Sequence, residues 1–230
     1  MLISESKNIS RQKKFIADVS HELRTPITVI KNYVEILENF GAEDPELFQE
    51  SMHAIKIAAE NMQNLVDSLL FLARADENAH NLRKISVELN DLINSAVAQI
   101  KNPRIQIIFG DKFNFIGDPE FLKKMFGEFF KNAILYSSDK IFVEIHVEKD
   151  FATVKIIDSG IGIAAEDIDK IFDRFYRADK SRTKIDDNKN SPGLGLSIAK
   201  WIAEQHEIKI SVQSELGTGS TFELFISQNH

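Results

Sequence analysis

Residues 15–26 read F-I-A-D-V-S-H-E-L-R-T-P, and they indicate a helix that carries one outward-facing histidine, His21. Apolar residues around this stretch recur at steps of three and four positions, with one step of seven, which is typical of the seam of a coiled coil or helical bundle. They are Ile9, Ile16, Val19, Leu23, Ile27, Ile30, Val34 and Leu37. His21 lies two positions from both Val19 and Leu23, so its side chain turns away from the seam. Thr25 follows four residues later and shares the helix face of His21.

We expect two long helices in the first third of the chain, joined by a short turn. The first runs over residues 4–40 and is expected to bend near Pro26, which lacks an amide hydrogen. The second runs over residues 46–76 and has its own apolar stripe. A hairpin of two helices cannot bury both stripes by itself, so the sequence favours a dimeric four-helix bundle. The alternative is that the hairpin packs on the second half of its own chain.

Length and composition describe an ordinary globular chain of one large or two small domains. It has 230 residues, of which 43% are hydrophobic and 27% charged. The net charge of -7 argues against a nucleic-acid-binding surface, so we expect no nucleic acid partner. The absence of cysteine excludes disulfides, thiol catalysis and cysteine-ligated zinc. No apolar run approaches the ~20 residues that cross a bilayer. We therefore expect a cytoplasmic chain as given, anchored to a membrane only through a segment outside it.

After a polar linker at residues 78–84, the hydrophobic pattern predicts a mixture of strands and helices. Strands are expected at residues 85–89, 104–109, 140–147, 152–157, 208–214 and 221–227, and helices at 92–100, 119–136 and 192–205. Asp118 is a candidate N-cap for the longest of these helices. The pattern predicts a two-layer α/β sandwich after the hairpin, so the fold class is α+β. Residues 179–190 hold one apolar residue and are expected to form a mobile lid.

Two polar clusters before the lid suit a nucleotide and its metal ion. Glu128 and Asn132 lie four positions apart on one face of a predicted helix. Their oxygens suit a magnesium ion that also contacts phosphates, although a surface glutamate and a helix-end asparagine have the same spacing. Residues 158–163 read D-S-G-I-G-I and follow a strand. Gly160 and Gly162 allow close backbone approach, and Asp158 can accept a hydrogen bond from an amino group such as that of adenine.

A third cluster follows the lid and suits phosphate binding. Residues 192–200 read P-G-L-G-L-S-I-A-K, so that Gly193 and Gly195 lead into a helix. The start of a helix offers free amide hydrogens and a positive dipole end to phosphate oxygens. The cluster differs from a P-loop because no Lys-Ser/Thr pair follows the glycine in the required register.

The ordered motifs resemble those of sensor histidine kinases of two-component systems over nearly the whole chain. Residues 21–26, H-E-L-R-T-P, resemble the phosphoacceptor box, and the three clusters resemble the N, G1 and G2 boxes of the catalytic domain. Residues 172–177 resemble the F box, and residues 217–222 resemble the last glycine box. That catalytic domain belongs to the Bergerat, or GHKL, ATPase superfamily, which includes DNA gyrase and mismatch-repair ATPases.

The resemblance implies an ATP- and Mg²⁺-dependent protein-histidine kinase that works as a homodimer. Residues 1–77 would form the dimerisation and phosphotransfer hairpin, 78–84 the linker, and 85–230 the ATP-binding domain. The phosphoryl group would pass from His21 to an aspartate in the receiver domain of a response regulator. The resemblance assigns to Glu22 the uptake of the proton from the other ring nitrogen. It also implies that Thr25 would help to orient a water molecule for dephosphorylating the regulator.

The resemblance also implies a set of nucleotide contacts. Asn132 and Glu128 would hold magnesium, Asp158 would bind the adenine amino group, and Tyr136 would lie beside the base. The glycine contacts would be Gly160 and Gly162 in the first loop, with Gly193, Gly195 and the adjoining Leu196 near the phosphates. Arg177, in the lid, is a candidate cation for the γ-phosphate, and a solvated arginine is the equal alternative.

Three departures from the family pattern leave other functions open. Leu135 stands where the family usually has a lysine, and Ser191 and Pro192 replace the first glycine region of the G2 box, so we expect weaker nucleotide binding than in kinases with the full boxes. Glu128 stands where many of these kinases have asparagine, whereas gyrase-like ATPases have a water-activating glutamate. The alternatives are a hydrolytic GHKL ATPase and a degenerate dimeric scaffold that binds a regulator. Phosphorylation within one chain or across the dimer stays open.

Overall fold

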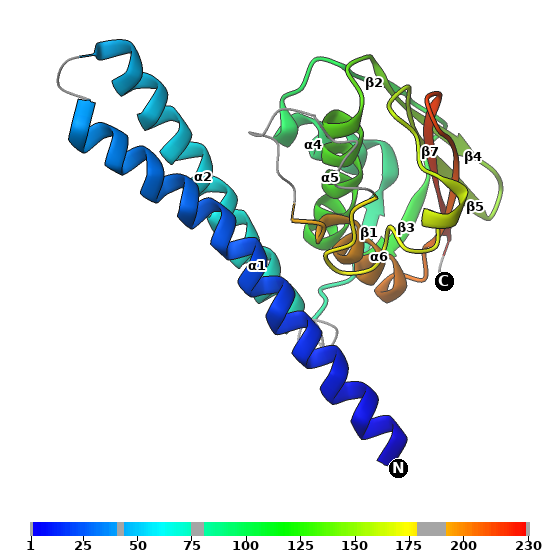
Figure 1. The fold of residues 1–230 in the computed structure, drawn as a ribbon. Coiled ribbons are helices and arrows are strands. Elements are labelled where there is room, and N and C mark those ends of the chain that lie inside the picture. Colours follow the sequence, from blue (N-terminus) through cyan, green and yellow to red (C-terminus); the bar gives the residue numbers. More distant parts are fainter. Residues whose placement is uncertain (1, 41–43, 75–80, 179–191, 229–230) are drawn as a thin grey trace. The chain divides into compact units, whose positions relative to one another are not determined.

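The computed structural model describes residues 2–40, 44–74, 81–178 and 192–228, with side chains from Phe15 onward. It divides into two compact units, which are described one at a time. The first contains most of a helical hairpin, and the second, which begins at Phe71, contains a mixed sheet with helices (Figure 1). The expected fold class, a helical hairpin followed by a two-layer α/β domain, is confirmed. The predicted domain limits stay a prediction.

The hairpin consists of α1, Leu2–Phe40, and α2, Pro45–Ala73. Pro26 lies inside α1, and the helix continues on both sides of it. Asp44 caps the start of α2, because its Oδ1 accepts hydrogen bonds from the backbone N–H groups of Glu46 and Leu47 at 2.9 and 3.1 Å. The predicted end of this helix, at residue 76, lies outside the described residues. Within the described ranges, no helix combines the length and the hydropathy that a membrane span requires.

The hairpin leaves a large part of its apolar surface exposed. Ala58 and Leu65 of α2 are buried. Eight large apolar residues are between 39% and 58% exposed: Ile16, Ile27, Val34 and Phe40 on α1, and Phe48, Met52, Val66 and Leu70 on α2. On α1, Ile27 and Val34 lie seven residues apart, and on α2 the pairs Phe48–Met52 and Val66–Leu70 lie four apart, so the exposed residues gather into an apolar stripe on each helix. An apolar stripe of this length is unusual on a surface that stays in water.

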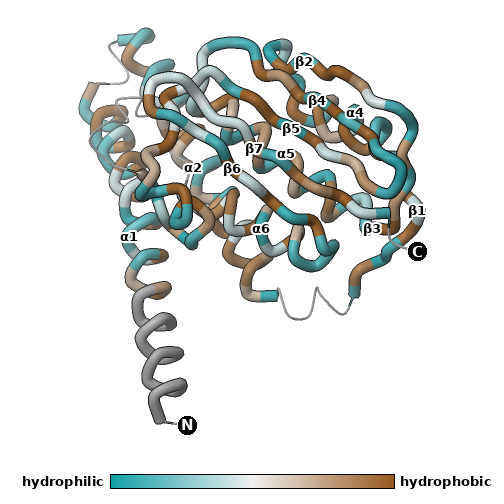
Figure 2. The backbone as a smooth tube through the Cα atoms, turned by 90° about the vertical axis from the view of Figure 1, so that its right-hand side faces the viewer, coloured by the Kyte–Doolittle hydropathy of each residue, from teal (hydrophilic) through white to brown (hydrophobic). Residues whose placement is uncertain are grey.

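The second unit is built on a five-stranded sheet of order β2-β4-β5-β7-β6. The strands are β2 Ile105–Ile108, β4 Ile141–Val147, β5 Phe151–Asp158, β6 Lys209–Glu215 and β7 Gly219–Ser227. β2 pairs with β4 in parallel, and every other neighbour is antiparallel. Figure 2 shows these strands in front, with hydrophobic and hydrophilic residues following each other along them. This alternation gives the sheet one face for the core and one polar face.

A separate two-stranded ribbon joins β1, Ile85–Glu88, to β3, Asn114–Gly117. The sequence analysis did not predict β3. Its four residues include asparagine and glycine, which are depleted in strands, and only the antiparallel register with β1 makes it a strand.

Three helices cover one side of the sheet: α4 Leu89–Ile100, α5 Pro119–Tyr136 and α6 Gly195–Gln205 (Figure 1). α5 has the predicted bounds. α4 begins three residues earlier than predicted because the Glu88 side chain caps it, accepting a hydrogen bond from the Asp91 N–H at 2.9 Å. The core between these helices and the sheet is rich in phenylalanine; the ring centres of Phe129 and Phe222, for example, lie 5.4 Å apart.

Phe71, the first residue of the second unit, takes part in a cluster of three aromatic rings. Its ring centre lies 5.8 Å from that of Phe121 and 5.4 Å from that of Trp201, and the last two are 6.1 Å apart. Lys124 Nζ lies 5.2 Å from the centre of the Phe71 ring. The compact second unit therefore begins before the first strand of the sheet.

Asp118 and His206 tie the beginning of α5 to the end of α6. Asp118 is the N-cap of α5, as predicted, because its Oδ1 accepts from the next two N–H groups of the helix at 3.0 and 3.2 Å. Its Oδ2 accepts from the Arg83 N–H at 2.8 Å, and its own N–H donates to His206 Nε2 at 3.0 Å. His206 Nδ1 lies 2.8 Å from the Ile202 carbonyl oxygen, so this ring is a neutral tautomer with its proton on Nδ1. Burial lowers the pKa of His206.

We predict that the chain loses stability in mild acid because of His206. Since its folded-state pKa is below the ordinary value of 6.5, its stabilising contribution is present above that pH and is lost as the pH falls through the lowered pKa. Titration of this one group changes the free energy of unfolding by at most about 1.4 kcal/mol per pH unit. Urea unfolding from about pH 8 to about pH 5 measures it. A His206→Gln variant should lose this part of the slope, and an unchanged slope would contradict the assignment.

Candidate functional site

The first chemical element is the helix face around His21. His21 and Thr25 are exposed on α1, whereas Glu22, Val19 and Leu23 are partly buried. The imidazole therefore faces away from the seam of the hairpin, as the spacing predicts. An exposed imidazole can act as a nucleophile when it is neutral.

The second element is a buried carboxylate at the end of β5. Asp158 is 6% exposed, and its Oδ1 accepts a hydrogen bond from the Gly160 N–H at 2.8 Å. The Ser220 N–H also donates to this carboxylate, and Ser220 pairs with Asp158 across β5 and β7. Burial raises the pKa of Asp158, and the two backbone donors partly oppose that shift. The donors fix the carboxylate and leave it acceptor capacity for a ligand amino group.

Glycines allow the loops around Asp158 to interlock. A Cβ added at Gly160 would lie 2.4 Å from the Tyr136 carbonyl oxygen, which also accepts from the Ile161 N–H. A Cβ at Gly162, whose φ is +69°, would lie 2.0 Å from the Glu215 carbonyl oxygen. A Cβ at Gly219 would lie 2.0 Å from the Asp158 carbonyl oxygen. A side chain at Gly160 would therefore push the loop that carries Asp158 away from the end of α5, and one at Gly162 or Gly219 would push this loop away from the turn between β6 and β7.

The carboxyl-terminal end of α5 forms one wall of the site. Asn132 and Tyr136 are partly buried there, one turn apart. Burial raises the pKa of Tyr136, while the positive charge of Arg177 acts in the opposite direction. The structure therefore brings Arg177, predicted from the sequence as a lid cation, within electrostatic range of the Tyr136 hydroxyl.

Arg104 supports this wall, and the sequence analysis did not identify it. Its guanidinium donates hydrogen bonds to three carbonyl oxygens in and just after the last turn of α5, those of Ile134 at 3.0 Å, Asp139 at 3.4 Å and Ser137. The Ile134 carbonyl belongs to the last turn of α5, at the negative end of the helix dipole, which a cation stabilises. Sequence spacing contains no signal for this contact, because Arg104 precedes its partners by 30 residues or more.

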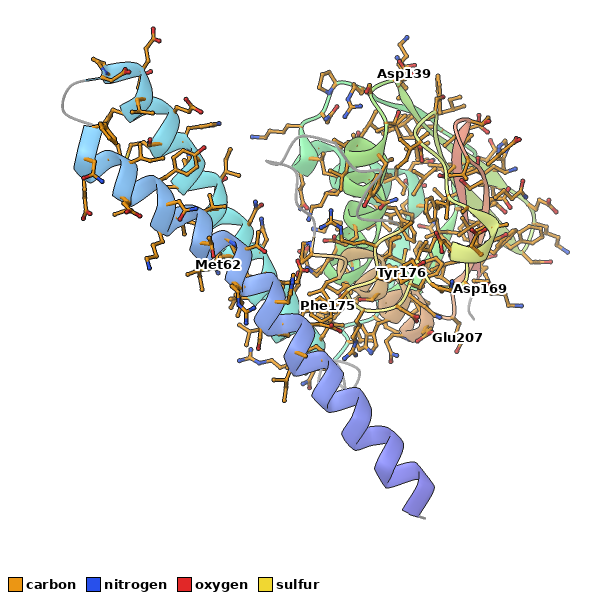
Figure 3. All side chains as sticks on the ribbon, in the orientation of Figure 1. Met62, Asp139, Asp169, Phe175, Tyr176 and Glu207 are labelled. Atoms are coloured by element: carbon orange, nitrogen blue, oxygen red, sulfur yellow. The ribbon has the colours of Figure 1, made fainter. Side chains whose placement is uncertain are left out.

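Backbone contacts join the two edges of the segment that contains the predicted lid. The Phe175 N–H donates to the Gly193 carbonyl oxygen at 2.9 Å. Phe175 has a φ of +63° and Gly193 a φ of +71°, so both edges adopt the left-handed conformation. The Tyr176 hydroxyl donates to Asp167, and this hydrogen bond raises the pKa of Tyr176 to about 12. Phe175 and Tyr176 are labelled in Figure 3. The predicted lid itself, residues 179–190, lies outside the described residues.

Glu128 contacts the start of α6. A Cβ added at Gly195, the first residue of α6, would lie 2.6 Å from Glu128 Oε2. Glu128 Oε1 pairs with Lys131 Nζ at 3.0 Å. The sequence analysis predicted that this helix begins at Pro192, but it begins at Gly195. Leu196 lies in its first turn and is partly buried.

The donors on α5 fit a magnesium ion that is held mainly by phosphates. Glu128 and Asn132 supply a carboxylate and an amide oxygen from one helix face. Among the described residues, no three histidine, aspartate or glutamate side chains gather into a metal cluster. Magnesium accepts such a sparse protein site, because it keeps several waters and takes its other ligands from phosphate groups.

An exposed histidine on a helical hairpin, followed by this α/β fold, defines the class of histidine kinases. Two family models match the chain: the His Kinase A (phospho-acceptor) domain over residues 11–78, and the Histidine kinase-, DNA gyrase B-, and HSP90-like ATPase over residues 117–230. Together they cover about four fifths of the sequence, and the chain belongs to the sensor histidine kinase family.

Individual relatives agree with this assignment. The sensor histidine kinase YkoH of Bacillus subtilis (strain 168) is 33% identical over an alignment of 237 positions, which covers 100% of this chain and 51% of YkoH. The chain thus spans about half the length of that relative. Among solved structures, histidine kinase ThkA in complex with response regulator protein TrrA matches with a TM-score of 0.71 and 22% identity, over 97% of this chain and 64% of that one. Full-length ShkA in complex with AMPPNP matches with a TM-score of 0.63 and 21% identity, over 94% and 46%. Both structural matches show the fold.

Proposed function

We propose that the chain is the kinase portion of a two-component sensor protein. It would bind ATP in the second unit, phosphorylate itself on His21 and pass the phosphoryl group to an aspartate of a response regulator. Dephosphorylation of the regulator, with Thr25 orienting the attacking water, belongs to the same proposal. The observation that carries it is the Asp158 carboxylate, buried and fixed by the Gly160 and Ser220 N–H groups among closely packed glycine loops. Such a carboxylate suits the amino group of adenine.

The phosphoryl transfer would use residues of both units. A ring nitrogen of His21 forms a bond to the γ-phosphorus, the bond from phosphorus to the bridging oxygen breaks, and ADP leaves. Glu22, beside His21, takes up the proton of the other ring nitrogen. Asn132 and Glu128 would hold the magnesium ion, which neutralises phosphate charge when bound. Arg177 adds a positive charge near Tyr136.

Three observations support the proposed ligand and partners. ShkA, of the same fold, was solved with AMPPNP, which supports ATP as the nucleotide. ThkA was solved with a response regulator, which supports a receiver domain as partner. The exposed apolar stripes of α1 and α2 support homodimerisation, because a second hairpin would cover them. These partners suit a cytoplasmic location, with any membrane anchor outside this chain.

Incubation of the whole chain with γ-labelled ATP tests the proposal. We expect an acid-labile, base-stable label on the protein that His21→Gln abolishes. The matched control is His53→Gln, which removes another exposed helical histidine and should leave the label in place. Release of phosphate without labelling, lost in Glu128→Gln, would support the hydrolase. A chain that neither labels nor hydrolyses but still binds a receiver domain would be the scaffold.

A further inference from the structure

Lys131 is the flexible partner of an ion pair on α5. Its Nζ lies 3.0 Å from Glu128 Oε1. The Glu128 side chain is only 14% exposed, whereas that of Lys131 is 64% exposed. The carboxylate is therefore held in place, and the ammonium group, on its four-carbon stem, can leave it at little cost.

Glu128 holds this ammonium group near the start of α6. The close approach of Glu128 Oε2 to Gly195 places the carboxylate against the first residue of that helix. The N-cap residue of α6, Leu194, has no side chain that can accept a hydrogen bond. The amide hydrogens of the first turn and the helix dipole favour an anion here. A phosphate group that approaches this end of α6 also approaches Lys131.

The next turn of α5 provides no second positive charge that could pair with a phosphate group. Leu135 follows Lys131 by four residues, so the two side chains share a face of the helix, and Leu135 is apolar. Asn132, the direct neighbour of Lys131, is neutral. A triphosphate brings several negative charges to this wall, and Lys131 is placed to balance one of them.

We propose that Lys131 is the phosphate-binding cation of α5. Without nucleotide, its ammonium group pairs with Glu128; with ATP bound, it moves to a phosphate oxygen and frees the Glu128 carboxylate for the magnesium site. The inference rests on the proposed function, because it requires an ATP site between α5 and α6. Lys131 would then supply the positive charge that a lysine usually supplies at the position of Leu135 in this family.

Lys131→Met tests the proposal, with affinities for Mg-ATP and for adenosine measured by calorimetry on the whole chain. A charge-assisted hydrogen bond contributes enough that Mg-ATP affinity should fall about 10- to 100-fold. Adenosine lacks phosphates, so its affinity should not change. The matched control is Lys123→Met, which breaks an ion pair of the same spacing, with Glu120, at the other end of α5. That variant should bind both ligands as the wild type does.

A second substitution in the Lys131→Met background makes the test specific. Leu135→Lys returns a cation to the same helix face one turn later and should restore most of the Mg-ATP affinity. Mg-ATP binding by Lys131→Met that equals the Lys123→Met control overturns the proposal. So does an equal loss of adenosine affinity, because that loss would not concern phosphates. A wild-type chain that binds neither ligand contradicts the proposed function itself.

Discussion

Replacing Gly162 with alanine is expected to lower the free energy of unfolding of the second unit by about 3–5 kcal/mol and to abolish nucleotide binding. The new Cβ would lie 2.0 Å from the Glu215 carbonyl oxygen, in a backbone conformation with φ at +69°. Neither group can move alone, because the Gly217 N–H donates to the Ile161 carbonyl oxygen and the Ile163 N–H donates to Ser214 Oγ. Urea unfolding and ATP calorimetry measure the two effects.

Gly217→Ala is the matched control for that substitution. Gly217 also has a positive φ, +80°, but an added Cβ would meet no atom within 4 Å. The free energy of unfolding of the control should fall only by the cost of the left-handed backbone conformation for alanine, about 1–2 kcal/mol, and the control should still bind ATP. If the two variants unfold at the same urea concentration, the contact between the loop at Gly162 and the turn at Glu215 contributes nothing beyond backbone conformation.

Asp158→Asn is expected to reduce ATP affinity by about 100-fold or more and to remove the preference for adenine over guanine. The carboxylate already accepts from the N–H groups of Gly160 and Ser220. An asparagine NH₂ group would face either one of these donors or the amino group of the base, so one donor always opposes another. Competition calorimetry with ATP and GTP measures both the affinity and the preference.

The same substitution at the opposite end of β5 gives the control. Asp150 is exposed, directly before β5, and its backbone carbonyl accepts from the Gln228 N–H. Asp150→Asn should change neither the ATP affinity nor the ratio of ATP to GTP affinity. Asp158 would lose its proposed role if Asp158→Asn, with an unchanged urea midpoint, kept the wild-type preference for ATP.

Elements with strong local signals were predicted almost to the residue. α5 has both of its predicted ends, because Asp118 can cap it, Pro119 suits a first helical turn, and the chain beyond Tyr136 has no further apolar period. The exposed position of His21 followed from the three- and four-residue spacing of its neighbours. Such signals act within one or two turns of helix, where sequence distance and spatial distance agree.

Features that depend on contacts distant in sequence were not predicted. β3 becomes a strand through its register with β1, and Arg104 reaches the end of α5 across 30 residues of sequence. The α6 start was placed at Pro192, although the chain there first turns at Gly193 in the left-handed conformation to meet Phe175. The roles of Asp158 and the glycines were expected from family motifs, whereas the donor Ser220 N–H required the pairing of β5 with β7.

The aromatic cluster of Phe71, Phe121 and Trp201 has a practical consequence for protein production. A truncated gene product that starts at the first strand, Ile85, would lack the Phe71 ring and leave the other two rings facing water. Such a fragment should aggregate more readily on purification than one that starts upstream of Phe71. The cutting point for an isolated ATP-binding half is therefore set inside the second long helix, well before the polar segment that composition alone would suggest.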